Sequence, residues 1–365
     1  MPTVYKSPAA YVQGRGVTAE IGDHAASLGE TALLIADGMV LDLVEDDVRD
    51  SLEDAGIEAS SAEFNGESSE DEIARLAETT AEREADIVIG AGGGKALDTA
   101  KAVREQAGGA MVSMPTVAST DAPTSALSVI YSEHGEFQEY WFYADHPDLV
   151  LVDTEIVATA PARFFRSGIA DGLATWFEAD ATYQSHGDNV VGGKPTRAGH
   201  SLARLCYETL CDHGLSALDA VDSDVVTESV EAVTEANTLL SGLGFESGGL
   251  AAAHSIHNGL TQLEATHDAT HGEKVNIGTI TQLVLEGRDD EFIEEYITFS
   301  LDLGLPVTLE EIGLDDPDRS DLDIVAKAAC DDEETIHNQP FDVTPPVVRD
   351  ALVTVDEAGH RVRRS

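Results

Sequence analysis

The chain has 365 residues and a formal net charge of −48, with 69 acidic residues against 21 Lys and Arg. Its hydrophobic fraction of 42% is typical of a globular protein, and the length suggests about two domains. No basic patch is present that could neutralise phosphates, so nucleic acids and anionic membranes are disfavoured as partners. Because salt screens the repulsion between acidic groups, the charge predicts a halophilic protein of a saline cytoplasm.

Cysteine content and hydropathy indicate where in the cell the protein is located. The cysteines are only three, Cys206, Cys211 and Cys330, which cannot form a complete disulfide framework. The N-terminus lacks the basic and apolar pattern of a signal peptide, and no apolar stretch is long enough to span a bilayer. We therefore expect a cytoplasmic protein without membrane segments.

The first half of the chain predicts alternating strands and helices. Short apolar runs indicate strands at residues 31–36, 86–89, 110–114 and 149–152. Helical spacing occurs between them at residues 44–55 and 71–82, and residues 128–143 predict an inserted hairpin. This alternation is typical of a parallel sheet covered by helices.

After about residue 159 the pattern becomes helical, with few β-branched runs. The predicted helices are residues 165–183, 198–210, 225–239, 249–263 and 277–285. We therefore predict an α/β dinucleotide-binding domain over residues 1–160 and an all-α domain over residues 161–365.

The segment DIVIGAGGGKALDTAK, residues 86–101, joins a predicted strand to a predicted helix through a glycine cluster. Free backbone N–H groups and the positive end of a helix dipole bind anions, usually phosphates. The usual nucleotide motifs do not fit, because Ile89 and Lys95 occupy positions that require glycine. A tight, close-packed turn is the alternative explanation.

Two further polar features follow predicted strands. Asp37 ends the run ALLIAD, where a carboxylate can accept hydrogen bonds from ribose hydroxyls and repel a 2′-phosphate. Helix capping is the alternative role for this residue. The segment MPTVASTDAPTSALSVIY, residues 114–131, places several hydroxyl groups beside Asp121. Such a loop can bind a cofactor and a polyol, or can be a turn with capping residues.

Possible metal ligands occur in the second half. Asp171 lies in an otherwise apolar helical stretch, where a lone carboxylate is unusual. His254, His257, His267 and His271 follow in two short segments. Two histidines and one carboxylate can bind a divalent metal and leave positions open for substrate, whereas core histidines are often simply hydrogen-bonded. Spacing alone does not select two of the four.

Taken together, these stretches resemble the glycerol dehydrogenases of the metal-dependent, group III (iron-containing) alcohol dehydrogenase superfamily. The resemblance covers nearly the whole chain. It rests on SPAAYVQGRG, FNGESSEDEI, GAGGGKALDTAK, PTVASTDAPTSALSVIY, GIADGLATWFEA, GLAAAHSIHNGLT, THGEKVNIGT and ETIHNQPF. It implies the dehydroquinate synthase-like fold, with a nucleotide-binding α/β domain, a helical domain and a deep cleft between them.

The resemblance also implies roles for particular residues. One divalent metal per subunit, Zn²⁺ by preference or else Fe²⁺, would be held by Asp171, His254 and His271, and these three would act in catalysis and substrate binding. Asp121 would contact glycerol, while His257 and His267 would not be ligands. NAD would be bound by Asp37, Gly92, Gly93, Gly94, Lys95, Asp98, Thr116, Ser119, Ser125, Leu127 and Tyr131.

The implied activity is the reversible, NAD-dependent oxidation of glycerol to dihydroxyacetone by a homo-oligomer, often an octamer. The metal would polarise the substrate hydroxyls, and the only partner expected besides other subunits is a small-molecule substrate. Glycerol-1-phosphate dehydrogenase is the nearest rival, with Lys274 as a candidate phosphate ligand. Dehydroquinate synthase is a more distant one, and a non-catalytic protein that binds NAD or metal is a rival of another class.

Overall fold

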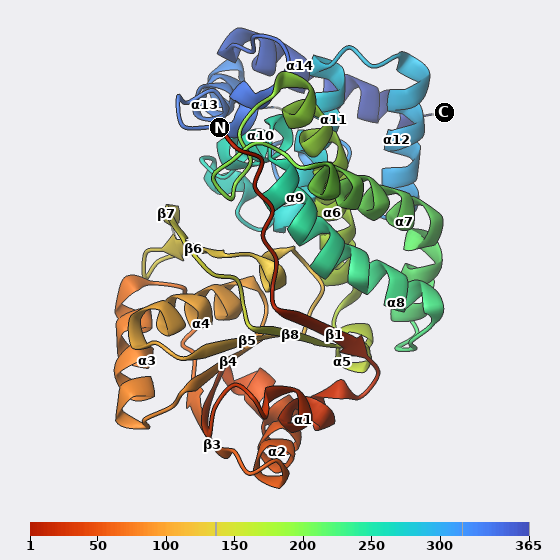
Figure 1. The fold of residues 1–365 in the computed structure, drawn as a ribbon. Helices are drawn as coiled ribbons and strands as arrows, with labels where there is room; N and C mark the ends of the chain where they lie inside the picture. The colour runs from red at the N-terminus through yellow and green to blue at the C-terminus, as the bar shows by residue number, and fades with distance from the viewer. Residues whose placement is uncertain (136, 316, 365) are drawn as a thin grey trace. The chain divides into compact units, whose positions relative to one another are not determined.

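A six-stranded parallel sheet forms the centre of the N-terminal half (Figure 1). The structure is a computed structural model that describes residues 1–135, 137–315 and 317–364. The strand order is β1-β8-β5-β4-β2-β3. The strands are β1 (Ala10–Gly14), β2 (Thr31–Ala36), β3 (Glu58–Glu63), β4 (Ile87–Gly92), β5 (Ala110–Pro115) and β8 (Leu149–Asp153). The four strands predicted from the sequence are confirmed, whereas β1 and β3 were not predicted.

Helices cover both faces of this sheet. α1 (Ile21–Ala25), α2 (Gly38–Asp54) and α5 (Thr154–Thr159) pack on one face, and α3 (Glu70–Glu82) and α4 (Gly94–Ala107) pack on the other. β2 shows why both faces are apolar. Leu34 belongs to the core on the α2 side, and its neighbours Leu33 and Ile35 belong to the core on the α3 side. Successive side chains of a strand point to opposite faces, so a continuous apolar run fits a sheet covered twice.

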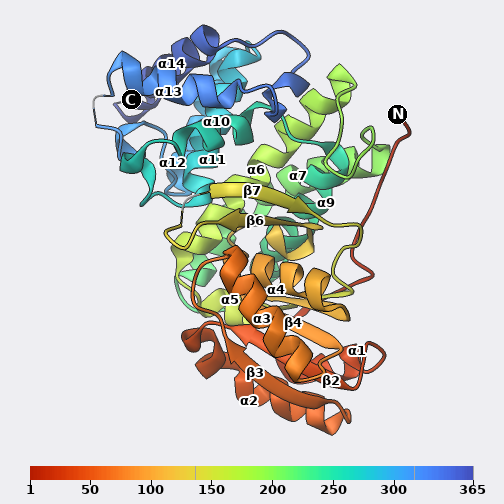
Figure 2. The same ribbon diagram turned by 90° about the vertical axis from the view of Figure 1, so that its left-hand side faces the viewer.

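The predicted hairpin is also present. β6 (Leu127–Tyr131) pairs antiparallel with β7 (Phe137–Phe142) in a separate two-stranded sheet (Figure 2). Glu136, within the predicted hairpin, lies outside the described residues.

The second half is helical, as predicted. Its helices are α6 (Ala162–Ser185), α7 (Arg197–Val221), α8 (Glu228–Glu235), α9 (Ser241–Gly248), α10 (Ala252–Leu260), α11 (His271–Leu285), α12 (Asp290–Asp302), α13 (Arg319–Ala329) and α14 (Pro345–Arg363). One apolar core joins α10, α11, α13 and α14. None of the helices in the described part of the chain combines the length and apolar character needed to cross a membrane.

The chain divides into two compact units. The sheet unit comprises residues 7–162 and 220–242, and the helical unit comprises residues 1–6, 163–219 and those from 243 onward. Residues 220–242 were expected in the helical domain but pack within the sheet unit instead. The reason is local: Thr124 Oγ1 donates a hydrogen bond to the Thr238 carbonyl (3.0 Å), and Asn237 Nδ2 donates to the Ala118 carbonyl (3.0 Å).

Candidate active site

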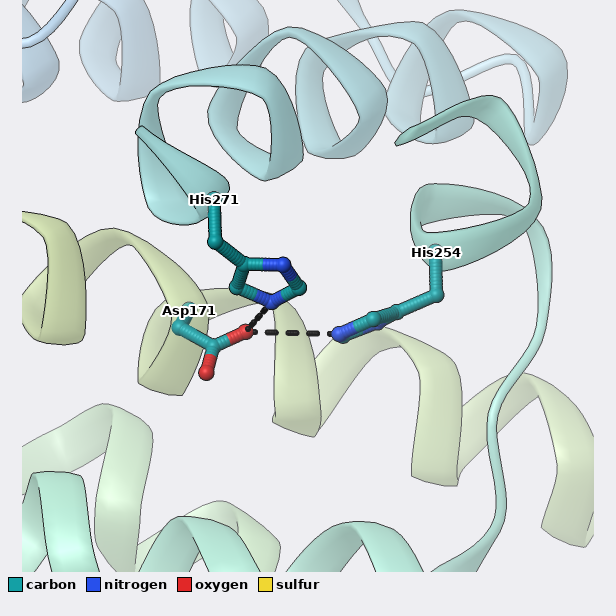
Figure 3. A group of neighbouring side chains, drawn as sticks. All are labelled: Asp171, His254 and His271. Carbon is teal, nitrogen blue, oxygen red and sulfur yellow. Dashed lines mark hydrogen bonds and ion pairs between the residues drawn. The ribbon is translucent and has the colours of Figure 1, made fainter. Parts of the chain in front are cut away.

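Three side chains converge within the helical unit: Asp171 from α6, His254 from α10 and His271 from α11 (Figure 3). One possible ligand atom from each lies within 4.8 Å of the others. Asp171 Oδ1 is 3.0 Å from His271 Nε2 and 3.3 Å from His254 Nε2. The structure therefore brings together the three residues that the resemblance implied, although their role as ligands stays a prediction.

The Asp171 carboxylate is buried at 1% exposure. Burial alone would raise its pKa, but His271 and His254 lower the pKa well below its usual range. Its Oδ2 atom has no hydrogen-bond partner among the described residues. An ionised, buried oxygen without a partner is costly, and a divalent cation held between this carboxylate and two imidazoles would remove that cost. The donor set therefore fits a divalent metal ion.

Glu178 on α6 is buried and orients His254. Its Oε2 atom lies 2.5 Å from His254 Nδ1, and its Oε1 accepts the backbone N–H groups of Ala251 and His254, both at 3.0 Å. Burial alone would lower the pKa of His254, but Glu178 and Asp171 raise the pKa well above its usual value. A carboxylate on Nδ1 leaves Nε2 as the ligand atom, which is the common arrangement at metal sites.

Contacts at their N-terminal ends hold the two histidine-bearing helices in place. Gln282 Oε1 accepts the N–H groups of Ala252 and Ala253, so buried side chains satisfy the otherwise unpaired N–H groups at the start of α10. At the start of α11, a Cβ on Gly272 would lie 1.9 Å from the Ser167 carbonyl oxygen. Only glycine permits this contact between α11 and α6, and the contact places His271 beside Asp171.

The two remaining histidines have different surroundings. His257 Nε2 lies 3.0 Å from His271 Nδ1, and His257 Nδ1 lies 3.1 Å from Asn258 Oδ1. Desolvation, with smaller contributions from His271 and Lys274, lowers the pKa of His257 well below its usual value. His267 is exposed, and its Nε2 contacts the Thr261 carbonyl at 3.2 Å. Neither belongs to the group of three.

The predicted nucleotide site lies at the carboxyl ends of β2 and β4 in the sheet unit. These strands are parallel neighbours, with Ile35 opposite Gly90, so Asp37 and Gly92 stand at the same level. β3 pairs with one side of β2, and the chain then crosses to the other side of β2 to form β4. β5 and β8 continue the sheet beyond β4 in that direction. Such a reversal of strand order is where open parallel sheets bind ligands. Asp37 also caps α2, because its side chain accepts the Val40 N–H at 3.0 Å.

The glycine turn is close-packed, as the alternative explanation from the sequence holds. Gly92 has a φ of +140°, and a Cβ there would lie 2.9 Å from the Ala96 Cβ, so close packing requires glycine. At Gly93 and Gly94 a Cβ would meet nothing closer than 3.5 Å. These are ordinary van der Waals distances, so packing does not require glycine at either position, and the cap residue Gly93 forms no side-chain hydrogen bond. Binding of the NAD pyrophosphate at this helix N-terminus stays a prediction.

The chain is similar over its full length to known proteins. Residues 8–154 match the model of the iron-containing alcohol dehydrogenase family. A glycolaldehyde reductase of Halobacterium salinarum is 74% identical over 100% of both chains, and a glycerol dehydrogenase of Citrobacter freundii is 48% identical over 99% of both. The chain belongs to the iron-containing alcohol dehydrogenase family. It is therefore an oxidoreductase.

A solved structure supports the same assignment for the fold. The glycerol dehydrogenase of Schizosaccharomyces pombe superposes with a TM-score of 0.96 and 38% identity, covering 100% of this chain and 92% of that one. The predicted fold, with an N-terminal α/β part and a helical C-terminal part, is thereby confirmed.

In the sheet unit, several predicted NAD residues already have protein partners. Both carboxylate oxygens of Glu67 accept hydrogen bonds from Lys95 Nζ at 2.7 Å, and the same ammonium lies 5.0 Å from the ring centre of Tyr131. Lys95 is therefore charge-paired near the turn. Asp98 is buried, forms an ion pair with Lys101 (2.8 Å) and accepts the N–H of Val129. The geometry gives Asp98 a structural role, and its contact with NAD stays a prediction.

The hydroxyl-rich loop after β5 is held from several sides. The Thr116 N–H donates to the Gly92 carbonyl, which joins the loop to the glycine turn. Ser125 Oγ accepts from Lys101 Nζ at 3.0 Å, and Asp121 Oδ2 accepts from Ser241 Oγ at 3.3 Å. The remaining predicted NAD residues of this region are Ser119, in the loop, and Leu127, the first residue of β6. The NAD and substrate contacts of these residues remain predictions.

Glu178, which orients His254, was not predicted from the sequence. It lies seven residues after Asp171 in the same apolar stretch, two helical turns further along one face. A second carboxylate at that spacing is itself a signal of a shared polar site, because apolar helices seldom bury two isolated acids.

Proposed function

We propose that the protein uses NAD to interconvert a vicinal diol and the matching α-hydroxycarbonyl compound, glycerol and dihydroxyacetone being the pair predicted from the sequence. The observation that carries the proposal is the group formed by the buried Asp171 and the partly buried His254 and His271, with Asp171 Oδ2 lacking a partner among the described residues. A divalent cation bound there, Zn²⁺ or Fe²⁺, would supply open positions for two adjacent oxygens and Lewis acidity that lowers a hydroxyl pKa.

The protein's own residues would supply charge to the metal, orient its ligands and bind NAD. Asp171 supplies one ionised oxygen, and Glu178 keeps Nε2 of His254 directed toward it. In the sheet unit, the start of α4 at Gly93 and Gly94 would bind the NAD pyrophosphate, and Asp37 would accept the adenosine ribose hydroxyls. NAD would accept the hydride from the carbinol carbon. We assign the substrate contact of the sheet unit to Asp121.

Ethylene glycol and glycolaldehyde are a second candidate pair. One observation favours them: the relative that is 74% identical over the full length is named a glycolaldehyde reductase. Both carbonyl compounds carry a hydroxyl on the neighbouring carbon, so the same donor set and the same cofactor serve either reaction.

The phosphorylated substrate of the rival activity is less compatible with the helical unit. Lys274, its candidate phosphate ligand, is buried at 7% exposure. Its ammonium group donates to the carbonyls of Thr266 (3.3 Å) and Ala269 (3.0 Å). A cation that caps backbone carbonyls has few donors left for a phosphate, so we do not assign glycerol-1-phosphate as the substrate.

The test is steady-state kinetics of the purified protein in concentrated KCl with Zn²⁺ or Fe²⁺. NADH formation would be followed with glycerol and with ethylene glycol, and NADH consumption with dihydroxyacetone and with glycolaldehyde. We expect turnover of at least one pair, abolished by a chelator and restored by metal. Binding of both NAD and metal without turnover of either pair would refute the proposal and favour the non-catalytic alternative. Light scattering on the same sample would test the expected homo-oligomer.

A further inference from the structure

We infer that Glu334, Asn258 and His257 form a chain of hydrogen bonds that fixes which ring nitrogen of His271 keeps its lone pair. The inference rests on the metal site of the proposed function and deepens it. It assigns these three side chains as positioning residues that act on the site through His271. All of them belong to the helical unit.

The chain of hydrogen bonds starts at Glu334, whose carboxylate, when ionised, can only accept hydrogen bonds. Its two oxygens lie 3.0 and 3.3 Å from Asn258 Nδ2. An amide presents donors on one side and an acceptor on the other, so this contact settles the orientation of the Asn258 side chain. Asn258 Oδ1 must then face His257.

The orientation of Asn258 determines the proton on His257. Asn258 Oδ1 is an acceptor 3.1 Å from His257 Nδ1, so the proton of His257 resides on Nδ1. With this proton on Nδ1, the neutral ring presents the lone pair of Nε2 to His271 Nδ1, 3.0 Å away.

The last link reaches the candidate ligand. His257 Nε2 accepts at 3.0 Å from His271 Nδ1, so the proton of a neutral His271 lies on Nδ1. His271 Nε2, which is 3.0 Å from Asp171 Oδ1, then keeps its lone pair. Without these hydrogen bonds, Asp171 would favour a proton on Nε2 of His271, and this proton would compete with the metal. The chain of hydrogen bonds opposes that tautomer.

The two histidines are thus oriented by different chemistry. A buried carboxylate, Glu178, accepts from Nδ1 of His254, whereas a neutral imidazole accepts from Nδ1 of His271. Outer hydrogen-bond partners of this kind affect metal affinity by about 10- to 100-fold.

The experiment measures the Zn²⁺ dissociation constant of chelator-treated, full-length protein by competition with a chromophoric chelator. Asn258→Leu removes the acceptor that faces His257, and Glu334→Leu removes the group that orients Asn258. Thr261→Val is the matched control, because Thr261 Oγ1 donates to the Asn258 backbone carbonyl (2.7 Å) and lies outside the chain. The double variant Asn258→Asp/Glu334→Gln keeps an acceptor facing His257 and exchanges donor and acceptor in the neighbouring bond.

We expect Asn258→Leu to weaken Zn²⁺ binding by about 10- to 100-fold. Glu334→Leu should weaken it in the same direction and to a smaller extent, and the control and the double variant should stay near the wild type. Leucine variants that bind as tightly as Thr261→Val would overturn the inference, as would a double variant as weak as Asn258→Leu. Failure of the proposed function is measured separately: a wild type that binds metal and NAD but turns over neither substrate pair refutes that function, whereas the Zn²⁺ dissociation constants of the variants still decide this inference.

Discussion

Replacing Glu178 by glutamine tests how His254 is held, with almost no change in side-chain shape. In the structure, Glu178 Oε1 accepts two backbone N–H groups, and glutamine can keep both with its own carbonyl oxygen. The third bond changes: Oε2 faces His254 Nδ1 at 2.5 Å, and glutamine places an NH₂ group there. An NH₂ group needs an acceptor, which moves the imidazole proton to Nε2, the atom that faces Asp171.

The size of the effect follows from the one bond that is lost. A hydrogen bond to a charged group contributes about 1.5–3 kcal/mol. Because about 1.4 kcal/mol corresponds to a factor of ten in binding, Glu178→Gln should weaken metal binding by about 10- to 100-fold. Activity at limiting metal should fall accordingly and should recover in part with excess metal.

The assay pairs metal titration with thermal unfolding, and Gln282→Met is the contrasting variant. Gln282 caps the same end of α10 through Ala252 and Ala253 but does not contact His254. Two buried N–H groups would lose their acceptor, at a cost of about 1–3 kcal/mol each, so this variant should unfold at a lower temperature. Its metal affinity while folded should be preserved. Equal metal affinities for Glu178→Gln and the wild type would refute the orienting role.

Three further predictions concern the ligands, the cofactor and the surface. Asp171→Asn, His254→Ala and His271→Ala should each lose metal and activity, whereas His267→Ala should keep both. The measurement is metal content per subunit, and loss of metal in His267→Ala with retention in His271→Ala would contradict the ligand assignment. Asp37→Ser should relax a preference for NAD over NADP in kcat/KM, because a carboxylate repels a 2′-phosphate; a wild type that uses both equally would remove Asp37 from the ribose site. The melting temperature should rise between low salt and molar KCl, as the net charge of −48 implies, and a flat profile would disprove the need for screening.

Sequence patterns predicted the buried strands well and the edge of the sheet poorly. β4 and β5 lie in the interior, where both faces require apolar side chains, so their runs stand out. β3 has the sequence EASSAE and lies at the edge, with no fully buried residue. An edge strand needs only backbone pairing on one side, and its side chains therefore carry little hydrophobic signal.

The candidate site shows a similar division. Residue types predicted a carboxylate and two histidines, and the resemblance selected His254 and His271 from four candidates. Local spacing could not make that selection, because it depends on where α10 and α11 meet α6, a tertiary contact set partly by Gly272. Glu178 and the chain from Glu334 were missed because each connects segments far apart in the sequence.

The division of the chain into two units has a consequence for how the protein is made. The chain passes between the units four times, after residues 6, 162, 219 and 242. The loop carrying Ala118 leaves the ribosome 119 residues before Asn237, the side chain that holds it. A nascent or truncated chain ending near residue 162 therefore lacks residues 220–242 of the sheet unit. Any exchange of that unit between relatives has to transfer residues 7–162 together with residues 220–242.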